Sequence, residues 1–218
     1  MSKILISVEG QTEEKFVKEL LVPHFERLGI FITPKVLMTK RVRSGPNFKG
    51  GFPNYENIKR EIQILLRDSS AKIVTTMYDF YGLPKEFPKE DSNKNLTSIQ
   101  KVETLEQNFK AEFNDSRFFP YFALHEFEAL LFSEPENIAS VLNEKNKAKE
   151  LEKVKNKFST PEEINENPNT APSKRIEKIF PAYQKPTHGI LASKEIGLKK
   201  MMEECPHFCS WVNKLKES

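Results

Sequence analysis

Residues 4–16 read Ile4-Leu5-Ile6-Ser7-Val8-Glu9-Gly10-Gln11-Thr12-Glu13-Glu14-Lys15-Phe16, and this stretch decides the fold. The apolar, β-branched run at its start predicts a buried strand over 4–8. Thr12 is a good helix N-cap, and acids in the first turn suit the positive end of the helix dipole. We therefore expect a strand followed by a helix. Glu9 would then lie at the carboxyl end of the strand, where open α/β sheets bind their ligands.

The same alternation of strand and helix continues to about residue 132. Further strands are predicted over Ile30–Met38, Lys72–Tyr78 and Phe118–Leu124. Helical spacing of apolar residues predicts helices over Thr12–Leu28, Tyr55–Arg67 and Leu96–Phe113, with Gly29 ending the first. This order indicates an α/β fold with a central, mostly parallel sheet flanked by helices.

The character of the sequence changes from Pro135 onward, where helical patterns and charged residues dominate. Helices are predicted over Ser173–Phe180, Ile190–Cys205 and His207–Leu215. We therefore divide the chain into an α/β core over residues 1–134 and a helical C-terminal extension over residues 135–218. The extension is expected to pack on the core as one compact unit.

The sequence argues against a membrane-spanning protein and against a secreted one. The chain has 218 residues, a net charge of +3 and 38% hydrophobic residues. No apolar run approaches the roughly 18–20 residues of a membrane span, and the N-terminus lacks a signal-peptide pattern. Cys205 and Cys209 are four residues apart, a poor spacing for a disulfide, and with His207 they make only an incomplete zinc set. We expect a cytoplasmic, reduced protein with no membrane partner.

Carboxylates follow three of the predicted strands: Glu9, Asp79, and Glu126 with Glu128. The carboxyl ends of parallel strands meet at one edge of a sheet, so these groups are able to converge there. A cation would offset their repulsion, and Mg²⁺ prefers such hard oxygen ligands. Glu13 is a further candidate ligand. The structural alternative is that Glu9 and Glu13 cap the first helix and Asp79 begins a turn.

Basic residues offer two places for nucleic acid to bind. A glycine-rich loop contains Lys40, Arg41 and Arg43. Such a loop can approach a phosphate backbone. The alternative is an exposed loop with no role in binding. Lys174 and Arg175 follow a Pro-Asn-Thr-Ala-Pro turn at a predicted helix start, where the helix dipole disfavours cations. That conflict favours a contact with substrate phosphate or with the acids.

His125 lies beside Glu126 at a predicted strand end. Such a histidine can act as a general acid or base. The alternative is a structural residue held by hydrogen bonds. The chain contains no Gly-x-x-x-x-Gly-Lys-Ser/Thr loop, no Gly-x-Gly-x-x-Gly fingerprint and no Gly-x-Ser-x-Gly elbow. These absences argue against an ATPase, a dinucleotide-binding enzyme and an α/β-hydrolase.

The segment Val8–Glu13 resembles the opening of TOPRIM-like proteins, a fold shared by topoisomerases, primases and overcoming-lysogenization-defect nucleases. More specifically, the chain resembles the bacterial domain-of-unknown-function family 4276. The stretches that carry this resemblance are Glu9–Phe16, Asp79-Phe80-Tyr81-Gly82-Leu83-Pro84, His125-Glu126-Phe127-Glu128-Ala129-Leu130-Leu131-Phe132 and Asn169-Thr170-Ala171-Pro172-Ser173-Lys174-Arg175-Ile176. The C-terminal stretches Ile196-Gly197-Leu198 and Cys205-Pro206-His207-Phe208 also fit, so the resemblance covers nearly the full chain.

The resemblance implies a TOPRIM-like Rossmannoid core and cleavage of nucleic acid that depends on Mg²⁺ or Mn²⁺. It also implies pairing with an ABC-type or AAA ATPase encoded nearby, in settings that suggest phage defence. Glu9 matches the TOPRIM glutamate, and Asp79 matches the first acid of the Asp-x-Asp motif. Tyr81 stands in place of the second acid.

The leading hypothesis is a metal-dependent nuclease that acts as an effector under the control of a partner ATPase. Glu9, Glu13, Asp79, Glu126 and Glu128 would hold or surround the metal. His125 would assist proton transfer, and Lys174 or Arg175 would bind phosphate. The alternative is a non-catalytic regulatory or binding subunit, which Tyr81 favours. A phosphotransferase acting on a small nucleotide is a third hypothesis. The sequence does not decide between DNA and RNA as the substrate. It also leaves open whether the chain forms a homo-oligomer.

Overall fold

The computed structural model describes residues 2–40, 48–49, 54–87, 96–165 and 168–217. They form two compact units: the first comprises residues 1–122 and 214–218, and the second comprises residues 123–213. Within the described ranges, no helix has both the length and the apolar character needed to cross a membrane. The two units are described one at a time below.

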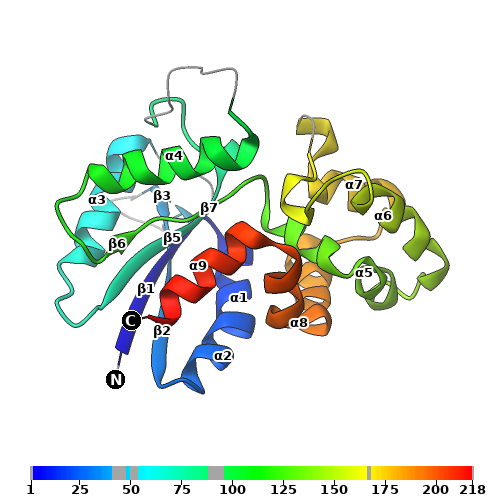
Figure 1. The fold of residues 1–218 in the computed structure, drawn as a ribbon, viewed down its shortest axis with the longest axis horizontal. Helices are drawn as coiled ribbons and strands as arrows, with labels where there is room; N and C mark the ends of the chain where they lie inside the picture. Colours follow the sequence, from blue (N-terminus) through cyan, green and yellow to red (C-terminus); the bar gives the residue numbers. More distant parts are fainter. Residues whose placement is uncertain (1, 41–47, 50–53, 88–95, 166–167, 218) are drawn as a thin grey trace. The chain divides into compact units, whose positions relative to one another are not determined.

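The first unit is built on a sheet with the strand order β2-β1-β5-β6 (Figure 1). Its strands are β1 (Ser2–Val8), β2 (Ile30–Val36), β5 (Ile73–Asp79) and β6 (Phe118–Phe119). All three pairings along this order are parallel. The two-residue strand β7 (Phe122–Ala123) also pairs with β5, and β3 (Met38–Lys40) forms a separate antiparallel pair with β4 (Phe48–Lys49). The predicted parallel sheet is confirmed.

The connections between strands determine which helices cover each face of the sheet. The chain moves one way across the sheet from β1 to β2, and the other way from β2 to β5 and from β5 to β6. Because parallel crossovers are right-handed, helices in connections of opposite direction lie on opposite faces. Figure 1 agrees, with α1 (Gln11–Phe16) and α2 (Val22–Glu26) on one side of the strands and α3 (Tyr55–Leu66) and α4 (Ser98–Ala111) on the other.

The first helical segment departs from its prediction at both ends. It begins at Gln11 after the N-cap Gly10, so Thr12 lies inside the first turn and its prediction as the N-cap is wrong. A π-helical turn over Val17–Leu21 separates α1 from α2, just before Pro23. Proline has no N–H to give to the helix ladder, which is one cause of such a local change. Gly29 has a φ of 73°, a conformation that glycine adopts without strain.

Helices α3 and α4 begin at well-formed caps. The Asn54 side chain accepts a hydrogen bond from the Asn57 N–H at the start of α3. Thr97 and Gln100 form a reciprocal capping box at the start of α4. Helix α4 then packs on the sheet through the buried Phe109. The ring of Phe109 has its centroid within 4.7–5.9 Å of the rings of Phe87, Phe113, Phe118 and Phe122.

The strand predicted over Phe118–Leu124 is divided into β6 and β7. Pro120 lies between them and has no backbone N–H for a sheet ladder. The buried Thr76 side chain of β5 takes over part of the pairing. Its hydroxyl donates to the Tyr121 carbonyl at 2.8 Å and accepts from the Tyr121 N–H at 2.9 Å. The residues after β6 therefore stay attached to the centre of the sheet.

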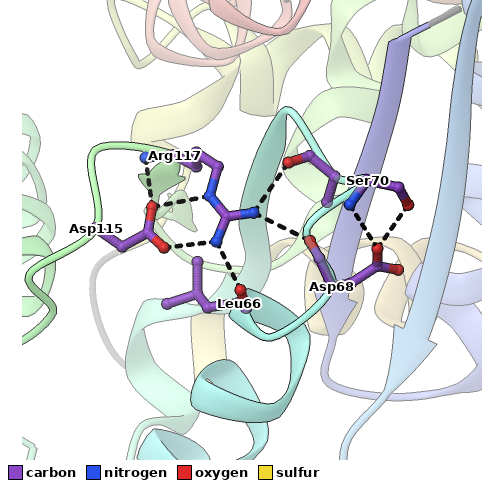
Figure 2. Close-up of polar contacts among 6 residues, drawn as sticks. Leu66, Asp68, Ser70, Asp115 and Arg117 are labelled. Atoms are coloured by element: carbon purple, nitrogen blue, oxygen red, sulfur yellow. Dashed lines mark hydrogen bonds and ion pairs between the residues drawn. The ribbon is translucent and has the colours of Figure 1, made fainter.

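Arg117 organises the amino-terminal edge of the sheet (Figure 2). Its guanidinium makes a two-pronged ion pair with Asp115, at 3.0 and 2.7 Å. It also donates to the carbonyls of Leu66, Asp68 and Ala71. The first of these carbonyls belongs to the last turn of α3, where a cation is favourable. This network fixes the start of β5, at the end of the sheet opposite to the carboxyl ends of the strands.

The second unit is helical, as predicted for the C-terminal part. Its α-helices are α5 (Pro135–Val141), α6 (Ala148–Lys155), α7 (Pro172–Ile179), α8 (Ile190–Glu204) and α9 (Pro206–Lys216), of which residues 206–213 belong to this unit. Short 3₁₀ turns include Phe127–Ser133 and Pro161–Glu163, and a π turn covers Lys185–Gly189. Helix α8 is kinked at Gly197, whose φ is 76°.

A buried carboxylate begins helix α9. Glu162 is 3% exposed and accepts hydrogen bonds from the backbone N–H groups of His207 and Phe208, at 3.0 and 2.9 Å. A negative group at a helix N-terminus satisfies amides that lack helical partners and suits the helix dipole. Cys205 and Cys209, on either side of these residues, are free thiols.

Candidate functional site

The carboxyl edge of the sheet in the first unit carries the acids that the sequence analysis placed there. Glu9 directly follows β1, and Asp79 is the last residue of β5. These two strands are parallel neighbours, with Val8 paired to Met77. Glu9 and Asp79 therefore follow that pair by one and two residues on adjacent strands. Each side chain is partly exposed. The backbone register brings these two carboxylates to the same stretch of the edge.

Glu13 lies in the first turn of α1 and is 6% exposed. The N-cap Gly10 has no side chain with which to cap this helix. An acid in the first turn still interacts favourably with the helix dipole. Glu13 thus has a structural reason to be in this turn, and its sequence places it four residues after Glu9.

The donor set at this edge suits a magnesium or manganese ion. Mg²⁺ is commonly held by one or two carboxylates together with waters and substrate phosphates, without a complete protein cage. Glu9 and Asp79 supply such a pair of hard oxygen ligands. Within each unit, over the described residues, no three His, Cys, Asp or Glu side chains gather closely enough to hold a metal alone. An ion held by Glu9 and Asp79 would take its remaining ligands from water and phosphate.

Tyr81 occupies the place where the resembled motif has its second acid. It lies in a 3₁₀ turn over Phe80–Gly82, immediately after Asp79, and is 59% exposed. Its ring meets that of Phe80 edge-on, with centroids 5.3 Å apart. A phenol oxygen is a poorer ligand for a hard divalent cation than a carboxylate oxygen. Asp79 is the acid that this turn provides.

The second unit holds the other predicted acids, and it gives them partners of their own. Glu126 Oε2 accepts a hydrogen bond of 3.0 Å from the backbone N–H of Ser173, at the start of α7. Its other oxygen lies 4.0 Å from the Lys185 ammonium. Glu126 thus sits at the N-terminus of a helix whose first residues have no side-chain cap of their own.

Glu128 is completely buried. The Lys185 ammonium lies 2.9 Å from Glu128 Oε2 and 5.4 Å from the centroid of the Phe127 ring. Burial raises the pKa of Glu128 to about 8, although Lys185 acts in the opposite direction. A buried carboxylate without a cation would be far more costly. We name Glu126, Glu128 and Lys185 the acid–lysine cluster.

Tyr183 and Gly189 border the acid–lysine cluster. Tyr183 is 7% exposed, and its pKa is raised by burial and by the charges of Glu128 and Glu126. Its hydroxyl has no hydrogen-bond partner among the described residues. A Cβ atom on Gly189 would lie only 2.7 Å from this hydroxyl and 3.1 Å from Phe127 Cζ. Position 189 therefore admits no side chain without a shift of Tyr183 or Phe127.

His125 is buried in the second unit, with 3% exposure. Its Nδ1 lies 3.2 Å from the side-chain nitrogen of Asn165. Burial lowers the pKa of His125 to about 4, although the charge of Glu126 acts to raise it. The ring is therefore neutral at physiological pH, which limits its value as a proton shuttle there.

The basic residues proposed for nucleic acid fall into two groups. Lys40 ends β3, where only its backbone is described, and Arg41 and Arg43 lie outside the described residues. Lys174 is exposed and pairs with Glu177 at 2.6 Å. Arg175 donates through Nε to the Thr170 carbonyl at 2.7 Å and lies over the ring of Phe158. Lys174 is thus the more accessible of the two basic residues on α7.

Lys185, Tyr183 and Asn165 were missed by the sequence analysis. Each follows the His125–Glu128 segment by at least 37 positions, and none lies in a strand-end pattern. The available signal was indirect: Glu128 stands in an apolar run, where a buried acid requires a cation. That argument predicts some lysine or arginine partner without saying which one.

The comparisons with known proteins agree with the stretches quoted for the family resemblance. A family model described as "Domain of unknown function (DUF4276)" matches residues 8–216. The chain belongs to the DUF4276 family. A search of the curated proteins finds no match to it.

Two solved structures are similar to this DUF4276 chain at low identity. One is the C-terminal region of the OLD protein of Xanthomonas campestris pv. campestris, with a TM-score of 0.46, 13% identity, and coverage of 100% of this chain and 96% of that chain. The other is the C-terminal region of the Burkholderia pseudomallei OLD protein, with a TM-score of 0.44, 14% identity and coverage of 99% of both chains.

Proposed function

We propose that this DUF4276 chain is a metal-dependent nuclease that hydrolyses phosphodiester bonds in DNA or RNA. The observation that carries the proposal is the position of Glu9 and Asp79 at the carboxyl ends of two adjacent parallel strands. Open α/β sheets bind ligands at this edge. Two partly exposed acids at such an edge offer the hard oxygen ligands that suit a divalent cation.

In this proposal Glu9 and Asp79 hold Mg²⁺ or Mn²⁺, and Glu13 supports them from the first turn of α1. Such an ion, when bound, polarises a phosphate and makes a bound water more acidic. The protein contributes the fixed carboxylates and a strand edge held in place by the parallel register. Glu126 and Glu128 have a lysine as their counter-ion, and we assign them to organising the second unit.

Contacts with the nucleic-acid backbone are proposed for exposed or partly exposed basic residues. Lys174 is exposed and Arg175 is partly exposed at the start of α7. Lys40, Arg41 and Arg43 are proposed as a further phosphate contact on the sequence pattern alone. With a net charge of only +3, binding would depend on such local groups and would weaken as salt increases.

The biological setting is proposed from the family resemblance. We propose an effector of phage defence whose nuclease activity is controlled by an ABC-type or AAA ATPase encoded nearby. Co-purification of the chain with the neighbouring ATPase, followed by cleavage assays with and without ATP, tests this control. An ATPase that neither binds the chain nor changes its activity would remove this part of the proposal.

A second candidate function is a non-catalytic regulatory or binding subunit of an ATPase complex. The observation that favours it is Tyr81, an exposed aromatic residue where the resembled motif carries its second acid. A subunit of this kind would bind its partner or nucleic acid without turnover. It would also show no metal-dependent change in thermal stability.

The deciding experiment is a cleavage assay on plasmid DNA, linear DNA and tRNA with Mg²⁺, Mn²⁺ or EDTA. The proteins compared are wild type, Glu9→Gln, Asp79→Asn and the control Glu14→Gln, which removes an acid paired with Lys18 on the same helix. We expect cleavage by wild type and the control, and a loss of about 100-fold or more in the two test variants. Cleavage at the wild-type rate by Glu9→Gln would contradict the proposal. Failure of the wild type to cleave any substrate, alone or with its ATPase, would favour the regulatory subunit.

A further inference from the structure

The lysines of residues 143–157 divide into two groups by what they contact. This segment carries six lysines and three glutamates, a net charge of +3 that equals the net charge of the whole chain. Two of its lysines, Lys147 and Lys155, are half-buried. The other four are exposed, and we name them the lysine row: Lys145, Lys149, Lys153 and Lys157.

The two half-buried lysines stabilise the second unit. Helix α6 packs against α5 and α7 (Figure 1). Lys147 donates at 3.2 Å to the carbonyl of Ile179, the last residue of α7, where the helix dipole favours a cation. Lys155 donates to the Ser133 carbonyl at 3.0 Å and lies 2.9 Å from the Glu204 carboxylate. Both lysines therefore join α6 to other elements of the unit.

The lysine row makes no contact of this kind. None of its four ammonium groups forms an ion pair or a hydrogen bond with a residue that the structure describes. An acid is close in sequence, because Glu152 follows Lys149 by three positions, yet the two side chains do not pair. By contrast, the exposed Lys174 pairs with Glu177 at the same spacing. The row is therefore free to meet a partner from solvent.

The positions of these lysines are unfavourable for the helix itself. Lys149 and Lys153 lie one turn apart in α6, and the row continues at four-residue spacing on both sides. Like charges at this spacing repel each other and destabilise a helix. Lys149 also lies in the first turn, at the positive end of the dipole, where no side chain caps the helix. A bound polyanion would offset both effects.

We propose that the lysine row binds the phosphodiester backbone of nucleic acid. Lysines four positions apart on a helix are about 6 Å apart along its axis. The charges of one DNA strand are about 3.4 Å apart, so each lysine meets a separate phosphate. Lysine contacts phosphate as a point charge and reads no base edge, so we expect binding without sequence preference. The choice of partner rests on the proposed nuclease function, whereas the binding is measurable without cleavage.

Fluorescence anisotropy in EDTA tests the proposal with labelled duplex DNA, single-stranded DNA and tRNA. The test variant is Lys149→Gln/Lys153→Gln, and Lys149→Arg/Lys153→Arg keeps the charge. The control Lys194→Gln/Lys199→Gln removes two exposed lysines of α8 in the same unit. We expect the test variant to bind about 10-fold more weakly or worse at 0.1 M salt. Its slope of log affinity against log salt should fall by about two, because each lysine releases about one counterion. The other two variants should bind as wild type does.

Three outcomes would overturn the proposal. Equal weakening in the test variant and the α8 control would mean that net charge alone matters. Thermal unfolding of the test variant should occur at or above the wild-type midpoint, because repulsion within α6 is relieved. A lower midpoint would make the row structural. Binding of the neighbouring ATPase through the row, with no binding of nucleic acid, would assign these lysines to an acidic protein surface.

Cleavage assays separate this inference from the proposed function. If wild type binds nucleic acid through the row and cleaves no substrate, the nuclease proposal fails and this inference stands. If wild type cleaves, and the glutamine variant binds and cleaves as wild type does, this inference fails and the nuclease stands.

Discussion

The carboxyl edge of the sheet and the acid–lysine cluster use the same residue type in opposite ways. At the edge, Glu9 and Asp79 are partly exposed on adjacent strands. In the cluster, Glu128 is fully buried with the Lys185 ammonium 2.9 Å away, and Glu126 receives a backbone N–H from Ser173. Carboxylates whose charge is already offset by the protein are poor places for an added cation. In the proposal the edge carries the metal, whereas the cluster is built around its lysine.

Removal of the lysine should have the largest effect on stability. At pH 9, where Glu128 is ionised in the wild type, Lys185→Met leaves this carboxylate buried without its cation, a change that typically costs about 3–5 kcal/mol. Chemical denaturation measures the loss in the free energy of unfolding. The control Lys174→Met removes an exposed lysine with an i,i+3 partner and should leave the unfolding midpoint nearly unchanged. Equal losses of unfolding free energy in the two variants would show that Lys185 stabilises the fold no more than an exposed lysine does.

The double variant Lys185→Met/Glu128→Leu refines the same test. It removes both charges and leaves an apolar site of similar volume, so it should recover much of the stability lost in Lys185→Met. Further destabilisation by the second change would indicate that Glu128 stabilises the unit through partners other than Lys185.

The free energy of unfolding should depend on pH through the titration of Glu128. Its pKa is about 8 in the folded state, above its ordinary value of 4.5, so between pH 4.5 and 8 the folded state holds a proton that the unfolded state has lost. Its contribution is therefore complete below about pH 4.5 and is lost as the pH rises to 8. His125, with a lowered pKa, acts in the opposite direction below pH 6.5.

Between pH 6.5 and 8, Glu128 contributes to the pH dependence of the free energy of unfolding and His125 does not. Wild type should lose about 1–2 kcal/mol of unfolding free energy across it, at 1.36 kcal/mol for each pKa unit. Glu128→Gln cannot ionise and should flatten this slope, as measured by denaturation at several pH values. A slope that is the same in the variant would place the titration elsewhere.

Replacement of an edge acid should have the smallest effect on the metal-free protein. Glu9→Gln keeps the shape of the side chain and relieves repulsion from neighbouring carboxylates, so its cost in EDTA should be about 1 kcal/mol or less. Thermal unfolding of the two proteins side by side measures it. A loss as large as that of Lys185→Met would mean that Glu9 serves the fold and would remove the contrast between the two regions.

The edge could be predicted from the sequence because its signals are local. A β-branched run ends at Glu9, another ends at Asp79, and the parallel order follows from alternating strands and helices. Helix bounds were predicted to within a few residues for α3 and α4. The errors have local causes as well: Gly10, not Thr12, is the N-cap of α1, and Pro120 divides the last predicted strand.

The acid–lysine cluster could not be predicted in the same way, because it depends on tertiary pairing. The sequence marked Glu126 and Glu128 as important but not their partner Lys185, which belongs to a different local segment. Nothing in a single sequence states which lysine meets a buried acid. Asn165 was missed for the same reason, since an asparagine in a turn is ordinary until its neighbour is known.

The most direct test of the central claim is thermal unfolding of wild type, Glu9→Gln, Asp79→Asn and Glu14→Gln over a series of Mg²⁺ and Mn²⁺ concentrations. A metal at 100 times its dissociation constant stabilises the folded state by about 2.7 kcal/mol. We predict a rise of the unfolding midpoint with metal in wild type and Glu14→Gln, and none in Glu9→Gln or Asp79→Asn. An equal rise in all four proteins, or no rise in wild type, would contradict the assignment of the metal to this edge.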